Sequence, residues 1–151
     1  MEPYHTVEAI MTRNSSNAGD WKGAFATRTA AGFAEAFAED IVLEATTLKR
    51  PVQGREQVKV VMAAASQLYK SLEFTDTATV GAKQYLEWVA EAHAGVKFSG
   101  VTVLTRDTTG AIVHVAIHHR PMEAAIFFSK TMGKSLRGAL DPTYFLHEHA
   151  A

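Results

Sequence analysis

The chain contains no cysteine among its 151 residues. This absence excludes disulfides, thiol nucleophiles and thiolate metal sites. An excess of positive charge is also lacking, since 15 Lys and Arg residues stand against 16 Asp and Glu, a formal net charge of −1. Proteins that bind nucleic acid need a basic surface to neutralise phosphates, so we expect no nucleic-acid partner.

Long hydrophobic runs are missing as well. No stretch approaches the 18 or so uninterrupted apolar residues of a membrane-spanning helix, so we expect no membrane partner. Residues 1–10 carry Glu2 and Glu8 and no apolar run, which argues against a secretory signal. We therefore expect a cytoplasmic protein.

The composition is that of an ordinary globular domain. Apolar residues make up 47% of the chain and charged residues 21%, and a chain of this length suits one domain with one core. We predict a single domain over residues 1–151, with peripheral segments at residues 1–20 and 141–151.

Three regions have helical spacing. Trp21 and Phe25 begin a helical hairpin, or a bent helix, around Thr29. Residues 55–69 place their apolar side chains on one stripe, which is typical of an amphipathic helix. Residues 121–138 open on proline and close on glycine, which predicts a final helix.

The remaining segments alternate between apolar and polar residues, which predicts β-strands. Short turns join the last four, so we expect them to form an antiparallel meander. The predicted strands span residues 41–46, 72–80, 85–93, 96–107 and 111–120. Helices gathered on one face of such a sheet make an α+β fold.

Two stretches resemble the SnoaL-like group of the nuclear transport factor 2-like superfamily. FAEDIVLE at residues 37–44, followed by VQGREQV at 52–58, is similar to the group's helix–strand–loop–helix signature. FSGVTVLTRD at 98–107, followed by GAIV at 110–113, is similar to its last hairpin. The resemblance implies the cystatin-like cone, a curved antiparallel sheet with helices packed on its concave face around one pocket. The superfamily contains isomerases, hydrolases, cyclases, dehydratases and non-enzymatic domains, so the fold alone does not select an activity.

The catalytic positions of two enzyme groups in this superfamily fall on named residues of the chain. The oxyanion-hole tyrosine of ketosteroid isomerase-like members falls on Trp21, and their two carboxylates fall near Ala45 and Thr102. The paired carboxylates of limonene epoxide hydrolase-like members fall on Glu87 and near Ile117. Of these residues, only Glu87 has the side chain that the family chemistry needs.

Glu87 and His119 are the candidate catalytic residues. By the resemblance, Glu87, Ile117 and His119 point into the pocket. A carboxylate on an apolar wall suits general acid or base catalysis, although a strand carboxylate also commonly pairs with Lys or Arg or faces solvent. Imidazole titrates near neutral pH and suits proton transfer, although a histidine at a strand end often only forms a structural hydrogen bond.

The other candidate site residues would bind a ligand. Glu44 is included as a second carboxylate, with an exposed or salt-bridged side chain as the alternative. The predicted ligand-binding residues are Trp21, Phe25, Glu44, Met62, Tyr69, Tyr85, Phe98, Thr102 and Ile117.

A metal site is not expected. His114 and His118 share a strand face but lie about 13 Å apart along it, too far for one ion. We predict that no metal or other cofactor is needed.

The opposite sheet face is expected to hold an apolar row that nothing else in the chain covers. A monomer seldom exposes such a patch, so we predict a homodimer through this outer face with Trp88 at its centre. The row consists of Leu86, Trp88, Ala90, Val101, Val103 and Ala116.

Three functions remain open at this point. The first is a metal-free acid–base isomerase, hydratase, hydrolase or cyclase acting on a small hydrophobic molecule. The second is a non-catalytic protein that binds such a molecule. The third is a dimeric interaction module whose pocket is filled by its own side chains. Two polar groups converging on one buried point would favour the enzyme.

Overall fold

The computed structural model describes residues 21–147. The predicted peripheral segment at residues 1–20 lies outside this range, as do residues 148–151. No helix among the described residues is both long and apolar enough to cross a lipid bilayer.

The first two helices form the predicted hairpin. Helix α2 (Trp21–Thr27) and helix α3 (Ala30–Ala36) are separated by Arg28 and Thr29. Arg28 adopts a left-handed backbone with φ 57°, and Thr29 caps α3 by accepting a 3.1 Å hydrogen bond from the amide of Gly32. A side-chain cap of this kind satisfies one of the unpaired amides at a helix start, which explains why the chain bends here.

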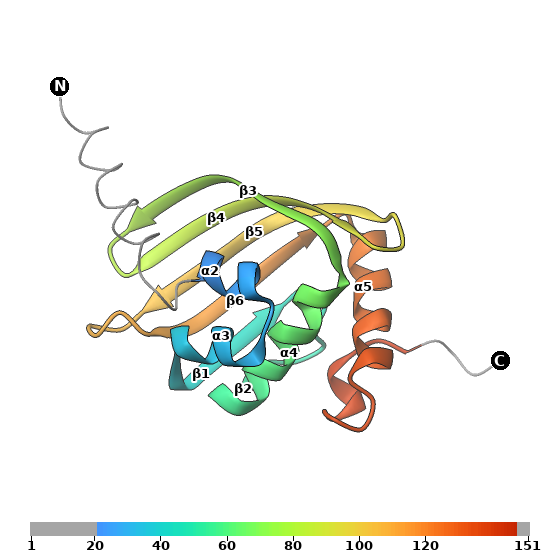
Figure 1. The fold of residues 1–151 in the computed structure, drawn as a ribbon, viewed down its shortest axis with the longest axis horizontal. Coiled ribbons are helices and arrows are strands. Elements are labelled where there is room, and N and C mark those ends of the chain that lie inside the picture. The colour runs from blue at the N-terminus through green and yellow to red at the C-terminus, as the bar shows by residue number, and fades with distance from the viewer. Residues whose placement is uncertain (1–20, 148–151) are drawn as a thin grey trace.

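Two longer helices complete the helical part. Helix α4 (Arg55–Leu68) has the predicted bounds to within one residue and buries one stripe. Helix α5 (Met122–Ser135) starts directly after Pro121, which follows a cis peptide bond. Figure 1 shows α2, α3 and α4 lying on one face of the sheet, while α5 lies beside its end.

The sheet has six strands in the order β2-β1-β6-β5-β4-β3. The meander β3–β6 is antiparallel as predicted, but β1 pairs in parallel with β6, so the sheet is mixed. Parallel neighbours need a long crossover, which here consists of α4 and the four strands β2, β3, β4 and β5. The strands are β1 (Phe37–Ala45), β2 (Val52–Gln53), β3 (Tyr69–Val80), β4 (Lys83–Ala92), β5 (Lys97–Arg106) and β6 (Ile112–Arg120).

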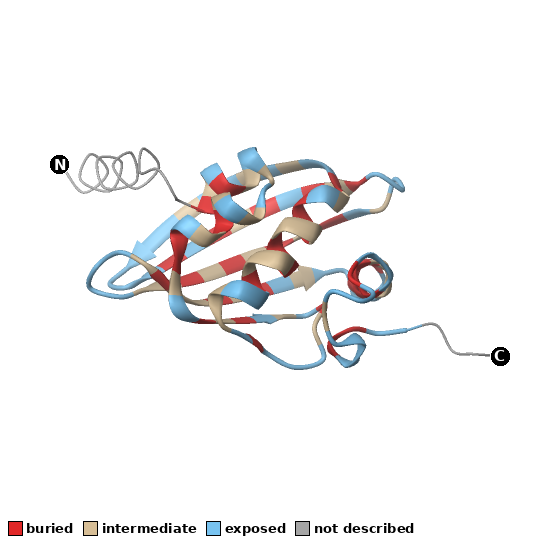
Figure 2. Ribbon diagram, turned by 60° about the horizontal axis from the view of Figure 1, so that its bottom comes forward, coloured by how far each residue is buried: buried red, intermediate tan, exposed pale blue. Residues whose placement is uncertain are grey.

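The core lies between the helices and the concave face of the sheet. In Figure 2, buried residues recur along the strands and along the helices that lie over them. Aromatic rings fill much of it: the ring centroids of Trp21 and Phe33 are 5.7 Å apart, and those of Phe25 and Phe33 are 5.1 Å apart. Each fully buried large apolar side chain contributes about 1.5–3 kcal/mol to folding, so this layer is the main source of stability.

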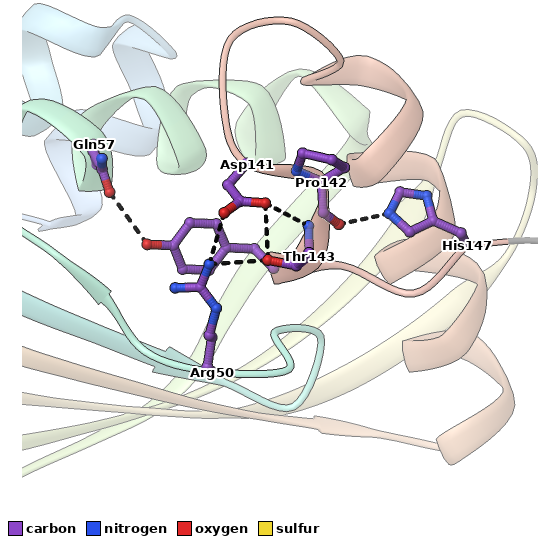
Figure 3. A network of polar contacts seen from close by, with 7 residues as sticks. Arg50, Gln57, Asp141, Pro142, Thr143 and His147 are labelled. Carbon is purple, nitrogen blue, oxygen red and sulfur yellow. Dashed lines mark hydrogen bonds and ion pairs between the residues drawn. The ribbon is translucent and has the colours of Figure 1, made fainter.

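The segment after α5 is held against the body by a polar network (Figure 3). Arg50 Nη2 lies 3.0 Å from Asp141 Oδ2 and donates a 3.0 Å hydrogen bond to Thr143 Oγ1. The guanidinium carbon of Arg50 lies 3.8 Å from the centroid of the Tyr144 ring, a cation–π contact. The basic spot at residues 49–50 therefore anchors the end of the chain.

The same segment contributes to the core, although a peripheral role was expected for it. Phe145 is 1% exposed and Tyr144 is buried. The amide of Leu146 donates to Ser129 Oγ at 3.0 Å. A side chain at Gly133 would begin 3.1 Å from Phe145 Cβ, so this glycine lets the segment lie close to α5.

Candidate functional site

The concave face of β4 carries the apolar row of that strand. Leu86, Trp88 and Ala90 are buried, while Tyr85, Glu87 and Val89, which alternate with them, point outward. The expected facing of this strand is therefore reversed, because the row predicted to lie outside the cone lies inside it.

The reversal follows from how Trp88 packs. Trp88 lies opposite Gly100 on β5, and a Cβ at Gly100 would come within 2.6 Å of the indole. The indole Nε1 donates a 3.0 Å hydrogen bond to Thr102 Oγ1, so its polar atom is satisfied inside the core. An all-apolar row belongs on the buried face of a strand, so the row that contains Trp88 faces the core and Glu87 faces outward.

Glu87 lies on the outer face, with its side chain 45% exposed and its Oε2 atom 3.9 Å from Arg120 Nη2. Tyr85 is 39% exposed on the same face. The expectation that Glu87 is buried and shares a cavity with His119 is wrong. Neither Glu87 nor Tyr85 reaches the interior of the cone.

Glu44 also faces outward. Its Oε2 atom lies 2.8 Å from His114 Nε2, and both side chains are at the surface. The alternative interpretation of Glu44, an exposed and paired carboxylate, is the one that the structure supports.

Residues of the described part of the chain line two small cavities inside the cone. The first measures about 10 Å³ and the second about 20 Å³, so each holds about one water molecule. The first is lined by Trp21, Phe25, Tyr69, Leu72, Phe74, Trp88, Thr102 and Ile117. The second is lined by Leu43, Ala45, Thr47, Leu48, Val61, Met62, Ala65, Tyr69, Ile117, His119, Phe128, Met132 and Phe145. Tyr69 and Ile117 form the wall between them, and Phe145 brings the C-terminal segment into the second.

His119 is enclosed by aromatic rings. Its ring centroid lies 5.5 Å from that of Trp88, 6.3 Å from that of Phe98 and 5.8 Å from that of Phe128. Its buried Nδ1 atom has no hydrogen-bond partner among the described residues. A buried polar atom without a partner is costly, and a ligand is one means of satisfying it.

The surroundings of His119 keep its imidazole neutral. Burial lowers its pKa from 6.5 to about 4, the charge of His118 adds to this shift, and the carbonyl of Ile117 opposes it. Desolvation disfavours the charged form of a base. At neutral pH the ring therefore presents one nitrogen that donates and one that accepts a hydrogen bond.

A third space, a depression of about 280 Å³, opens to the surface between α2 and β3. It shares Phe25, Tyr69, Leu72 and Phe74 with the first cavity, so these side chains separate the two spaces. Unlike the buried tryptophans, Phe25, Leu72 and Phe74 are only partly buried. The depression is lined by Lys22, Phe25, Ala26, Arg28, Ser66, Tyr69, Leu72 and Phe74.

No family model and no curated protein matches the sequence. Solved structures do match the fold. An uncharacterized bacterial protein with a cystatin-like fold from Silicibacter pomeroyi DSS-3 is 18% identical over 76% of this chain and 81% of its own, with a TM-score of 0.72. A steroid delta-isomerase from Pseudomonas aeruginosa is 21% identical over 78% of this chain and 87% of its own, also with a TM-score of 0.72.

The chain has the nuclear transport factor 2-like fold. A third structure with this fold is a hypothetical protein with a ketosteroid isomerase-like fold from Catenulispora acidiphila, solved in complex with trimethylamine. It is 16% identical over 64% of this chain and 79% of its own, with a TM-score of 0.55. At these identities the comparisons establish the architecture of the chain and not its activity.

Within the nuclear transport factor 2-like fold, most predicted pocket residues do meet. Trp21, Phe25, Tyr69, Thr102 and Ile117 line the first cavity, while Met62 and His119 line the second. Phe98 stacks on Tyr69 at 5.5 Å behind them. Their roles in binding or catalysis stay predictions.

Several residues of this interior were not among the predicted site residues, and five of them show why. For Trp88 the signal was present, because its strand has one fully apolar row. Leu72 and Phe74 belong to a predicted strand whose facing was left unassigned, and Phe128 and Phe145 come from segments that no local pattern relates to the sheet.

The burial of Tyr69 raises the pKa of its phenol well above the usual range. Among residues 21–147, no group of three or more His, Asp and Glu side chains is placed to hold a metal ion.

Proposed function

We propose that this chain binds one small, largely apolar molecule inside the cone, without acid–base catalysis by a carboxylate. The observation that carries the proposal is the make-up of the cavity walls. They combine apolar side chains with a few hydrogen-bonding groups, Thr102 beside Trp88 and the unsatisfied His119. This combination is typical of sites in which one or two polar groups orient an apolar ligand.

The comparisons support ligand binding in general terms. A steroid delta-isomerase and a protein in complex with trimethylamine have the same fold as this chain. The fold therefore accommodates small molecules in other proteins, and we extend this use of the fold to the present chain.

Binding is favoured over catalysis because none of the described residues places a carboxylate in the two cavities. Tyr69 and His119 are the titratable side chains that line the two cavities, and no carboxylate of the described residues joins them. Glu87, the predicted partner, is on the opposite face of the sheet. Acid–base catalysis needs groups that converge on one reacting point.

A ligand larger than water must displace side chains to enter. The wall between the surface depression and the first cavity consists of Phe25, Tyr69, Leu72 and Phe74. Phe25, Leu72 and Phe74 are partly exposed and so have room to turn outward. We propose that rotation of these side chains admits the ligand and that it then lies against Trp88 and Thr102.

Tryptophan fluorescence tests the proposal, because both tryptophans of the chain line the first cavity. We expect titration with octan-1-ol to shift the emission in a saturable way. Leu72→Phe enlarges the side chain at the wall and should weaken this binding at least about tenfold, since added volume in a packed passage has few places to go.

Val103→Phe is the matched control, because it makes a similar change on the outer face of β5. It should leave octan-1-ol binding intact. A saturable shift that is equal in the native chain and both variants would place the ligand elsewhere. No shift at all with octan-1-ol and with longer and shorter alcohols would refute the proposed function.

We also propose that two copies pair through the outer sheet face, with a centre different from the one first expected. Trp88 is inside the cone, but Tyr85 and Val89 are 39% and 45% exposed on the outer face, next to the half-buried Val103. Burying these side chains favours association.

Val89→Glu should convert dimers to monomers in light scattering, while Val80→Glu, at the exposed end of β3, should not. A native chain that is monomeric at micromolar concentration contradicts this pairing.

A further inference from the structure

The rim of the surface depression between α2 and β3 carries positive charge. Of its lining residues, two are cationic, Lys22 and Arg28, and none is acidic. Neither forms an ion pair with any of residues 21–147, in contrast to Arg50, Lys59 and Lys70. Two cations that have no ion-pair partner within residues 21–147 therefore flank the opening to an apolar interior.

Arg28 and Lys22 differ in the strength of their contacts with the rest of the domain. Arg28 Nη1 donates to the carbonyl of Tyr69 at 3.0 Å, so the guanidinium is attached to the start of β3. Lys22 Nζ has only a long contact of 3.5 Å with Thr77 Oγ1 and lies 5.6 Å from the centroid of the Phe74 ring. The ammonium group of Lys22 therefore has weaker contacts within the described residues than the guanidinium of Arg28 has.

Phe74 connects the Lys22 ammonium with the interior. Its ring is 6.1 Å from that of Phe25, edge to face, and both rings line the depression on one side and the first cavity on the other. Thr102 and Trp88 lie beyond these rings. A chain passing between Phe25 and Phe74 therefore has a cation at its outer end and an apolar cavity at its inner end.

We propose that the ligand of this chain is an amphipathic monoanion, a carboxylate with an unbranched or cyclic apolar tail. Its carboxylate lies in the depression against Lys22, with Arg28 adding to the positive potential. Its tail passes between Phe25 and Phe74 toward Thr102. This assignment rests on the proposed function and adds the chemical class of the ligand to it.

Comparing octanoate with octan-1-ol isolates the contribution of the carboxylate to affinity, because the two molecules have the same chain length. We expect the native chain to bind octanoate about fivefold more tightly than octan-1-ol, which is the upper range for one partly exposed ion pair. Tryptophan fluorescence at low salt measures both affinities. Added salt should reduce the octanoate advantage, because exposed charges are screened.

Lys22→Gln removes the ammonium group and should make the two ligands bind equally. Lys83→Gln is the matched control, since Lys83 also contacts a threonine hydroxyl, Thr105 Oγ1 at 3.2 Å, but at the start of β4 away from the depression. It should preserve the octanoate advantage. Thermal unfolding of both variants establishes that each is folded.

The outcomes separate this inference from the proposed function. Equal binding of octanoate and octan-1-ol by the native chain, or an octanoate advantage that survives Lys22→Gln, overturns the anion site and leaves the apolar site standing. Binding of neither ligand overturns the apolar site and the anion site together.

Discussion

The two faces of strands β4 and β5 differ in how polar groups find hydrogen-bond partners. On the concave face, Trp88 pairs its one polar atom with Thr102, and His119 on neighbouring β6 keeps a nitrogen without a partner among residues 21–147. On the convex face, Glu87 lies near Arg120 and apolar Tyr85 is partly exposed. Polar groups at the surface can exchange partners with water, whereas those in the interior cannot. On these strands, the group that lacks a hydrogen-bond partner among residues 21–147 is therefore His119 on the concave side, and not the water-exposed carboxylate of Glu87.

Truncating one aromatic residue on each face tests this contrast most directly. Trp88→Ala should lower the free energy of unfolding by about 4 kcal/mol, because it empties a packed volume in the core. Tyr85→Ala should lower it by less than about 1 kcal/mol, since Tyr85 is already 39% exposed. Urea denaturation measures both changes. Losses of similar size would mean that β4 does not face as described.

The neutral state of His119 should make stability depend on pH. Its folded pKa of about 4 is below the unfolded value of 6.5, so the unfolded chain binds the proton more readily between these two values. The free energy of unfolding should therefore fall by about 3 kcal/mol as the pH drops from 6.5 to 4.

Replacing His119 with Phe should flatten this part of the pH profile, while His118→Phe on the outer face should keep it. Denaturant unfolding at half-unit steps of pH gives the slope for each variant. An unchanged slope in the His119 variant would show that other groups cause the dependence.

Two glycines, one packed against its neighbours and one exposed, should respond in opposite ways to substitution by alanine. Gly100→Ala should destabilise the chain by about 2 kcal/mol, because the new methyl group would meet the carbonyl of His118 and the ring of Trp88. Gly23→Ala in α2 should stabilise it by about 0.5–1 kcal/mol, since nothing lies within 4 Å and alanine favours a helix. Opposite signs in thermal unfolding are the expected result. A neutral Gly100→Ala would mean that β5 and β6 separate more easily than their close approach suggests.

Removing the charge from Glu87 should have the smallest effect. Glu87→Gln breaks an exposed pair with Arg120 at 3.9 Å, and such pairs contribute less than about 0.5 kcal/mol. Octan-1-ol binding, measured by tryptophan fluorescence, should not change. Loss of octan-1-ol binding in this variant would show that Glu87 takes part in ligand binding.

The sequence predicted those parts of the fold that local patterns encode. The hairpin at Thr29, helix α4 and the antiparallel meander all followed from spacing and turn residues. The parallel pairing of β1 with β6 did not, because a strand's side-chain alternation says nothing about which distant strand lies beside it.

The inward facing of several candidate residues was predicted, while their roles stay predictions. Thr102 lies with the buried row of its strand, and Ile117 and His119, which the family resemblance places in the pocket, line the cavities. Glu87 was placed inside on family resemblance, against the apolar row that contains Trp88. Phe145 could not have been placed from spacing, because its position depends on the contacts of Arg50 with the C-terminal segment.

The parallel pairing of β1 with β6 also sets an order of assembly during synthesis on the ribosome. Phe37 lies beside Ile112, so the first strand emerges long before its neighbour exists. Until residues 112–120 are made, β1 cannot pair with β6, and the apolar side chains of β1 that face the core lack part of their packing. The meander β3–β5 can form earlier from contacts near in sequence. The vulnerable species in the cell is therefore the chain that stops short of β6, and a ribosome pause before residue 112 should lower the yield of folded protein more than one placed after residue 120.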